Sequence, residues 1–407
     1  MSASRTKYVT GRHYQTRRCV QLEISDGKIR GVRDLTGDAR APRNLNWIAP
    51  GFIDIQSNGY GGQEFSSLAL SVEHVAEIVG KQASFGVTQF CPTVTTAGFE
   101  TLAHGLRTID QACRRWPVVA YAVAGIHLEG PYISREDGPR GAHPTAHCRP
   151  PDWEEFQRLQ EAAGGRIRIL TLSPEYPEAA GFITRAVAGG VVVAIGHTTA
   201  DSAQIRAAVD AGATLSTHLG NGAHRTLRRH PNYIWDQMAE DRLMASLIVD
   251  GHHLPGEVVQ SLLRAKTPER CILVSDLSGL AGLPPGRYAT HLCELEILAD
   301  GRLVIAGQDQ LLAGASQPIS VSVGNVMRYA GVDLPTAVQM ASHHPARLLG
   351  LGEVRLLPGD AADLTLFDLH TSSDDRVTWL EITSTVAGGR LLLFAQQPFR
   401  RPAGPAG

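Results

Sequence analysis

The sequence predicts an α/β protein whose main part is a (β/α)8 barrel of the TIM type. About eight apolar, β-rich runs alternate with amphipathic stretches between residues 50 and 350, as in successive βα units. Several of these runs end in an acidic residue or a histidine, and the carboxyl ends of barrel strands converge on one face. A doubly wound open sheet is the alternative, but no GxGxxG follows the first run.

The expected strands are runs rich in apolar and β-branched residues. They cover residues 51–55, 87–91, 118–128, 167–172, 191–195, 215–218, 245–249 and 272–275. Amphipathic spacing predicts helices between several of them. These helices cover residues 72–82, 154–163, 179–188, 202–211 and 257–264.

Both ends of the chain carry short β-like runs. Residues 20–24 and 29–32 flank a turn that contains Asp26 and Gly27, which predicts a hairpin. Similar runs return at residues 363–366, 380–386 and 390–394. We expect the two ends to pack together as one small β-sandwich domain formed by both termini. The expected division is residues 1–49 and 351–407 for this domain, around a barrel at residues 50–350.

Bulk properties exclude several classes of function. The 407 residues carry a net charge of -2, which gives no electrostatic case for nucleic acid or an anionic membrane. No apolar run is long enough to span a bilayer, and the N-terminal residues lack the apolar core of a signal peptide. The six cysteines form no CxxC pair and are expected to be reduced thiols. We therefore expect a cytoplasmic protein.

Glu129, His197 and His218 each lie at or just after the end of a predicted strand and form a candidate metal site. Imidazole nitrogens and a carboxylate are usual ligands of a catalytic zinc or similar divalent ion, and three protein ligands leave one coordination position open. Each histidine alone is more readily explained as an ordinary polar residue at a strand end. The set on successive strands favours the metal site.

Two further residues are candidates for catalysis. Asp276 ends the run at 272–275, where a carboxylate near the metal is well placed as a general base. The same residue also suits the N-cap of a following segment. His143 lies in a long loop rich in glycine and proline at 138–147. Two interpretations of His143 are open. Either its side chain reaches over the site and polarises a carbonyl group, or it is an exposed histidine of the loop.

The segment 221–230 is rich in glycine, histidine and arginine. Backbone N–H groups at Asn221 and Gly222, with a nearby arginine, suit an anion such as phosphate, whereas a charged surface loop is the alternative. In the segment 250–253, either His252 or His253 can face the site. His343 and His344 are expected to begin a packing helix rather than to bind a metal.

Taken together, these residues give the chain a resemblance to the N-acetylglucosamine-6-phosphate deacetylase family of the amidohydrolase superfamily. The likeness covers nearly the whole chain, and HLEGP followed by the GH and THL segments is its most specific part. The matching segments are PGFID at 50–54, NGYGG at 58–62, PT at 92–93, HLEGP at 127–131, GHT at 196–198, THL at 217–219, DGHH at 250–253, VSD at 274–276, PAR at 345–347 and GDAADL at 359–364.

This resemblance implies a metal-dependent hydrolase that releases acetate from N-acetylglucosamine-6-phosphate. Glu129, His197 and His218 would hold one divalent ion, expected to be zinc, with iron, cobalt or manganese as alternatives. Asp276 would be the base that activates water and later protonates the leaving amine. His143 would help to hold the acetamide carbonyl.

The same resemblance implies contacts with the sugar and its phosphate. His253 would contact the sugar, and the backbone N–H groups of Asn221 and Gly222 would bind the phosphate. Arg229 would reach the phosphate of the neighbouring subunit in a homodimer.

The chain departs from the family pattern in three places. Many amidohydrolases carry His-x-His after the first strand and bind a second metal there, whereas this chain has Gln56 and Asn58, which predicts one metal. Residues 220–224 and 277–279 also differ, both near the expected sugar phosphate. The alternatives are therefore an amidohydrolase for N-acetylgalactosamine-6-phosphate or another N-acyl or cyclic amide, or a non-catalytic barrel that acts as a binding module.

Overall fold

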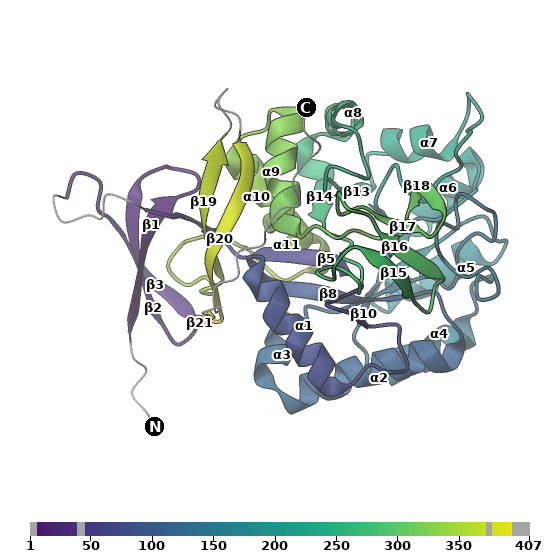
Figure 1. Cartoon of the computed structure of the whole chain (residues 1–407), viewed down its shortest axis with the longest axis horizontal. Helices are drawn as coiled ribbons and strands as arrows, with labels where there is room; N and C mark the ends of the chain where they lie inside the picture. The colour runs from purple at the N-terminus through teal and green to yellow at the C-terminus, as the bar shows by residue number, and fades with distance from the viewer. Residues whose placement is uncertain (1–5, 39–44, 372–376, 393–407) are drawn as a thin grey trace.

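A computed structural model describes residues 6–38, 45–371 and 377–392. Eight parallel strands form one sheet in the order β14-β13-β12-β11-β10-β9-β8-β5 (Figure 1). The strands are β5 (Phe52–Ser57), β8 (Val87–Thr95), β9 (Ile126–Glu129), β10 (Ile167–Leu172), β11 (Val192–Ile195), β12 (Leu215–Ser216), β13 (Met244–Ile248) and β14 (Cys271–Val274). The predicted alternation of strands and helices is confirmed.

The first and last strands of this sheet meet, so the sheet closes into a barrel. The N–H of Asp276 donates to the carbonyl of Gln56 at 2.9 Å, and Ser57 pairs with Leu277 in a parallel bridge. Beside this seam, the buried carboxylate of Asp54 accepts hydrogen bonds from the hydroxyl and the N–H of Ser275. These contacts fix the segment after β14 against β5 and thereby place Asp276 at the mouth of the barrel.

Helices cover the outside of the barrel. They are α1 (Val72–Ser84), α2 (Phe99–Arg115), α3 (Pro117–Ala122), α4 (Trp153–Ala162), α5 (Ala179–Ala188), α6 (Ser202–Asp210), α7 (Tyr233–Ala239), α8 (Gly256–Lys266), α9 (Ile319–Ala330), α10 (Leu334–Ala341) and α11 (His343–Leu349). α11 is the packing helix expected at His343, and it contacts β5 and β14.

The strand predicted at residues 118–128 is wrong over its first half. Those residues form α3, and only β9 is extended. Pro117 stands at the first position of α3, where its fixed φ favours a helix and its missing N–H leaves no bond unmade. The β-branched residues that follow it therefore continue a helical turn that packs against α1 and α2 instead of extending the strand.

The two ends of the chain form one seven-stranded sheet in the order β21-β20-β19-β4-β1-β2-β3 (Figure 1). Its strands are β1 (Lys7–His13), β2 (Cys19–Ser25), β3 (Lys28–Asp34), β4 (Trp47–Pro50), β19 (Leu364–Thr371), β20 (Val377–Ala387) and β21 (Arg390–Leu392). β4 joins the two ends, because it pairs with β1 on one side and β19 on the other. Residues 393–394 of the expected last run lie outside the described residues. The division into domains at 49/50 and 350/351 stays a prediction.

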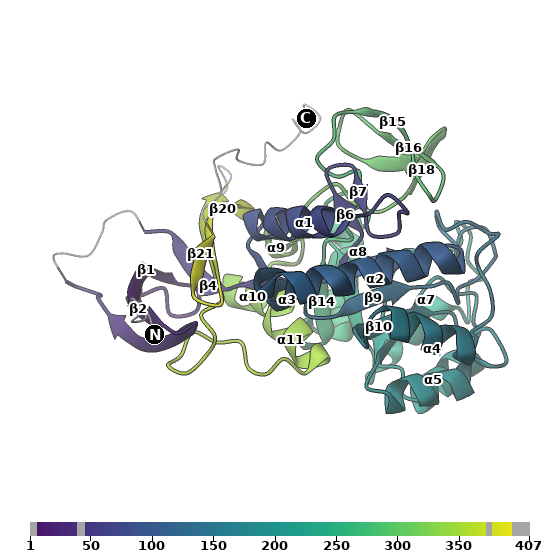
Figure 2. The same cartoon turned by 90° about the horizontal axis from the view of Figure 1, so that it is seen from below.

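A second, smaller sheet was not predicted from the sequence. Its four antiparallel strands are β15 (Gly286–Ala289), β16 (Glu294–Ile297), β17 (Leu303–Ile305) and β18 (Gln308–Leu312). We call residues 286–312 the insert, because they lie between β14 and α9. Figure 2 shows the insert standing at one end of the barrel, beside the short strands β6 (Gly59–Tyr60) and β7 (Gln63–Glu64). None of the helices in the described part of the chain is long and apolar enough to cross a membrane.

Candidate metal centre and substrate pocket

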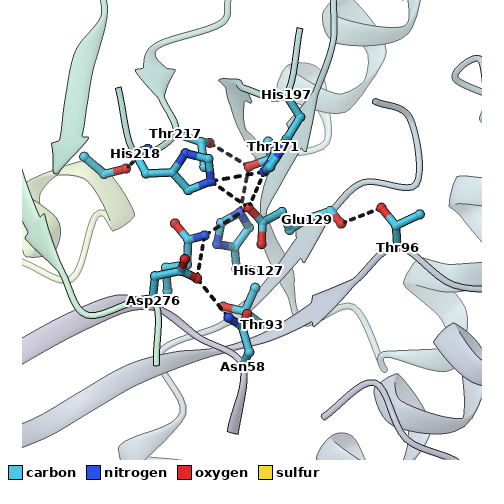
Figure 3. Close-up of polar contacts among 12 residues, drawn as sticks. Asn58, Thr93, Thr96, His127, Glu129, Thr171, His197, Thr217, His218 and Asp276 are labelled. Carbon is cyan, nitrogen blue, oxygen red and sulfur yellow. Dashed lines mark hydrogen bonds and ion pairs between the residues drawn. The ribbon is translucent and has the colours of Figure 1, made fainter. Parts of the chain in front are cut away.

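The barrel strands deliver four polar side chains to one point (Figure 3). Glu129 is the last residue of β9, while His197, His218 and Asp276 each follow the end of a strand by two residues. All four residues are at least 93% buried. The three that follow their strands have positive φ, at 51°, 31° and 51° in chain order. Such backbone strain in residues other than glycine is concentrated at functional sites.

Glu129, His197 and His218 converge on a common point. The Oε1 atom of Glu129 lies 3.2 Å from Nε2 of His197 and 3.0 Å from Nε2 of His218, and the two Nε2 atoms are 3.1 Å apart. Ligands of a tetrahedral ion with bonds of about 2.0–2.1 Å lie about 3.3 Å from one another. The three ligand atoms therefore fit a small divalent cation.

Hydrogen bonds orient His197 for such a role. Its Nδ1 lies 2.8 Å from the carbonyl oxygen of Pro139, so Nδ1 carries the proton and Nε2 presents a lone pair. Burial alone would raise the pKa of Glu129, but its contacts with His197 and His218 outweigh burial and hold that pKa well below its usual value. The carboxylate is thus ionised, as a metal ligand must be.

His143 lies over the same point. It is buried, its ring centroid is 4.4 Å from that of His197, and its Nδ1 has no hydrogen-bond partner in the described part of the chain. Ligand-capable atoms of His143, Glu129 and His197 all lie within 4.8 Å of one another. Burial, reinforced by His197, lowers the pKa of His143 well below its usual value. A neutral imidazole here keeps one N–H for an incoming carbonyl.

Gln56 and Asn58 bind the carboxylates from the side of the first strand. The amide of Gln56 donates to Oε1 of Glu129 at 3.0 Å and to Oδ1 of Asp276 at 3.2 Å, and the amide of Asn58 donates to the same Oδ1 at 2.8 Å. Burial, reinforced by the nearby Glu129, raises the pKa of Asp276 to about 7. Both amides present N–H groups rather than lone pairs to this space.

A buried polar layer lies beneath the centre (Figure 3). His127 contacts the carbonyl oxygen of Ile55 at 3.1 Å and the hydroxyl of Thr171 at 2.8 Å, and Thr171 contacts Thr217 at 2.7 Å. Burial lowers the pKa of His127 to about 4. This role of His127 was not predicted from the sequence, although His127 and Glu129 are two apart on one strand and therefore point to the same face.

A cavity of about 340 Å³ opens at this centre. Its walls come from the metal centre, from residues 220–225, from residues 252–253 and from the insert. Glu64, Ser66, Thr95 and His291 also line the cavity. None of these last four was predicted, because no motif marks them and only the tertiary fold brings them together.

The loop after β12 forms one end of the cavity. The backbone N–H of Asn221 is already bonded to the carbonyl of His218 at 2.9 Å, so the expectation that it is free for an anion is wrong; the turn after the strand uses it. The side-chain Nδ2 of Asn221 is buried and has no partner among the described residues. Gly222, His224 and Arg225 also line this end. Arg229 is exposed on the same loop and does not line the cavity.

His253 stands on another wall of the cavity. Its Nδ1 lies 2.8 Å from Oδ2 of Asp250, whose Oδ1 accepts the N–H groups of His252 and His253. Burial would lower the pKa of His253, but the charge of Asp250 outweighs it and raises that pKa. His252 lines the cavity as well, so both histidines of this segment reach it.

Comparisons with known proteins agree with this geometry. The chain matches the amidohydrolase family over residues 47–392. It is 35% identical to an N-acetylglucosamine-6-phosphate deacetylase from Homo sapiens over 80% of this chain and 81% of that protein. It is 32% identical to an N-acetylgalactosamine-6-phosphate deacetylase from Escherichia coli O157:H7, over 86% of this chain and 90% of the relative.

Solved structures of deacetylases also resemble this chain over most of its length. A crystal structure of N-acetyl-D-glucosamine-6-phosphate deacetylase from Mycobacterium smegmatis superposes with a TM-score of 0.81 at 31% identity, over 92% of this chain and 96% of that one. The deacetylase from Thermotoga maritima superposes with a TM-score of 0.78 at 26% identity, over 93% and 96%. The chain belongs to the amidohydrolase family and, within it, to the N-acetylglucosamine-6-phosphate deacetylase family.

Proposed function

We propose that this chain hydrolyses the acetamide of N-acetylglucosamine-6-phosphate to glucosamine-6-phosphate and acetate, a step in amino-sugar catabolism. One observation carries the proposal: a convergent set of metal-ligand atoms and the raised-pKa carboxyl of Asp276 share one buried cavity. A non-catalytic binding module would need neither a base of this kind nor three ligand atoms about 3 Å apart.

Glu129, His197 and His218 are the proposed ligands of one divalent ion. We prefer this set to one in which His143 replaces His218. The ligand atoms of the preferred set lie 3.0–3.2 Å apart, whereas those of Glu129, His143 and His197 lie within 4.8 Å of one another. Zinc is the proposed metal, since imidazole and carboxylate ligands suit it. Such an ion would lower the pKa of a water molecule and polarise the acetamide carbonyl.

Side chains of the protein then accept and donate the protons of the reaction. Oδ1 of Asp276 is held by two amides, which leaves Oδ2 to take a proton from the attacking water. The neutral imidazole of His143 donates to the carbonyl oxygen, where negative charge develops. Asp276 afterwards delivers its proton to the nitrogen of the leaving amine, so that one carboxyl serves as base and then as acid.

The loop after β12 is the proposed phosphate site. The unpartnered side chain of Asn221, the N–H of Gly222 and the exposed Arg225 are donors that suit a phosphate. His253, held by Asp250, is placed to contact the sugar. Arg229 is exposed on the same loop, which supports the proposal that it reaches the phosphate of a neighbouring subunit in a homodimer. We also propose a cytoplasmic location.

The experiment is to measure acetate release from N-acetylglucosamine-6-phosphate and the metal content of the same sample. We expect rapid release with about one metal per chain, as three ligands at one site imply. N-acetylgalactosamine-6-phosphate is compared in parallel, because a relative of that activity covers 86% of this chain. Plain N-acetylglucosamine serves as the control for the phosphate site. A metal-loaded protein that releases acetate from none of the three would refute the proposal.

A further inference from the structure

The insert covers one side of the cavity and is held to the barrel at its tip. His291, in the turn between β15 and β16, lies 2.8 Å from Oε2 of Glu64 through Nδ1 and 2.9 Å from the hydroxyl of Thr95 through Nε2. Glu64 belongs to β7, and Thr95 is the last residue of β8. One imidazole therefore joins the insert to two separate parts of the barrel.

These hydrogen bonds form a chain in which every proton has an acceptor. Ser66 accepts the backbone N–H of Thr95 at 2.7 Å, and the hydroxyls of Ser66 and Thr95 are 3.0 Å apart. If Ser66 donates to Thr95, the hydroxyl of Thr95 is free to donate to Nε2 of His291. Nδ1 of the imidazole then donates to the carboxylate of Glu64.

The insert has few other polar attachments. In the described part of the chain its strands pair only with one another, and Leu295, Ile297 and Leu303 pack in a small apolar cluster with Leu280 and Ala313, which flank the insert. Among the side chains described for residues 286–312, His291 alone makes hydrogen bonds to the barrel. The turn that carries it is itself fixed, because Thr290 accepts the N–H groups of Leu292 and Cys293. Among the described side chains of the insert, His291 is thus the one that fastens its tip to the barrel by hydrogen bonds.

The side of the cavity that is formed by Thr95 and the insert lies across the barrel from the proposed phosphate site. In the closed order of eight strands, β8 and β12 are four strands apart in either direction. A substrate with its phosphate on the loop after β12 and its amide at the metal centre therefore extends its acyl group towards β8. There Leu292 and Leu311 of the insert line the cavity together with Thr95.

We propose that His291 is a positioning residue that latches the insert to Glu64 and Thr95, and that the latched insert limits the N-acyl group to one as small as acetyl. The limit on acyl size rests on the proposed deacetylase function, whereas the latch does not. Loss of the latch would let the tip move away and make room for a longer acyl chain.

The test uses the metal-loaded full chain with His291→Ala, Glu64→Ala and the double variant. Arg287→Ala is the matched control, because it removes the exposed ion pair with Glu296 within the insert and leaves the latch intact. The first readout is amide hydrogen exchange in residues 286–312. Exchange should rise in both latch variants and remain at the wild-type level in the control. The double variant should add little to either single change, as expected for partners in one interaction.

The second readout compares kcat/KM for N-acetyl- and N-butyryl-glucosamine-6-phosphate. The preference for acetyl should fall about tenfold in His291→Ala, the effect of one lost hydrogen bond to a charged group. His291→Gln, which keeps a donor, should recover part of the preference. Unchanged exchange would overturn the latch. Raised exchange with an unchanged preference would overturn the acyl limit, and a wild-type protein that cleaves neither substrate would instead refute the deacetylase function.

Discussion

Replacement of Asp276 by asparagine separates catalysis from metal binding. Oδ1 of Asp276 accepts hydrogen bonds from Asn58 at 2.8 Å and from Gln56 at 3.2 Å, while its Oδ2 makes no hydrogen bond within the described residues. Asparagine can keep its oxygen in the position of Oδ1 and both of these bonds. Its Nδ2 then replaces Oδ2, the only atom that is free to accept a proton. The variant should therefore fold and bind metal normally while it lacks the base.

The size of the effect follows from this single change. A positioned general acid or base contributes about 10²–10⁴-fold to a rate, which corresponds to about 3–5 kcal/mol of activation free energy. We expect kcat for N-acetylglucosamine-6-phosphate to fall by that factor. Acetate release, metal content and the urea midpoint are measured on the same preparation. A metal-loaded variant that retains more than a tenth of the wild-type kcat would refute the role of Asp276, and loss of the metal would identify it as a ligand instead.

Four further predictions concern the metal, the pH dependence and the substrate. Glu129→Gln should weaken metal binding by more than about 100-fold, which exceeds the loss usual for residues that only hydrogen-bond to a metal ligand. His343→Gln on α11 is the control and should leave the metal content unchanged. Equal metal content in both variants would contradict the ligand set. Because burial raises the pKa of Asp276 to about 7 and a bound cation lowers it again, kcat/KM should fall with decreasing pH along a limb whose midpoint lies below 7, and a flat profile down to pH 4 would exclude an ionised base. His127 has a pKa of about 4 in the fold against 6.5 unfolded, so the unfolded chain binds more protons between these values, and the free energy of unfolding should fall by about 3 kcal/mol as pH drops from 6.5 to 4. Urea titrations of the metal-free protein at several pH values should show this dependence reduced in His127→Gln, and an identical dependence would contradict it. His253→Asn should raise KM for the phosphorylated sugar with metal content unchanged, as steady-state kinetics would show; an unchanged KM would remove His253 from the sugar site.

Local patterns in the sequence predicted the barrel and the convergence of the candidate metal ligands, because both depend on strand ends. Glu129, His197 and His218 each follow an apolar run, and the carboxyl ends of parallel strands must meet on one face of a barrel. The family resemblance then assigned their roles. By contrast, residues 118–128 were predicted to be one strand from their β-branched content, whereas Pro117 begins a helix there that packs on α1 and α2.

The strands of the insert could have been predicted from the sequence. Residues 286–312 alternate between apolar and polar side chains and contain an Asp-Gly turn at 300–301, which is a readable signal for strands. That signal predicts a sheet but not its position over the cavity. The latch joins residues 64, 95 and 291, and nothing in the sequence relates positions so far apart.

The sequence by itself determined the fold class, the succession of strands along the chain and the residues of the candidate metal centre, because these depend on periodicity and on residues at strand ends. Only the tertiary structure decided which hydrogen-bonding groups remain free. It shows that the N–H of Asn221 is used within a turn, that Gln56 and Asn58 donate to the carboxylates, and that His291 joins the insert to the barrel. The physical reason is that a hydrogen bond depends on the distance and direction between groups that the folded chain brings together, whatever their separation in sequence.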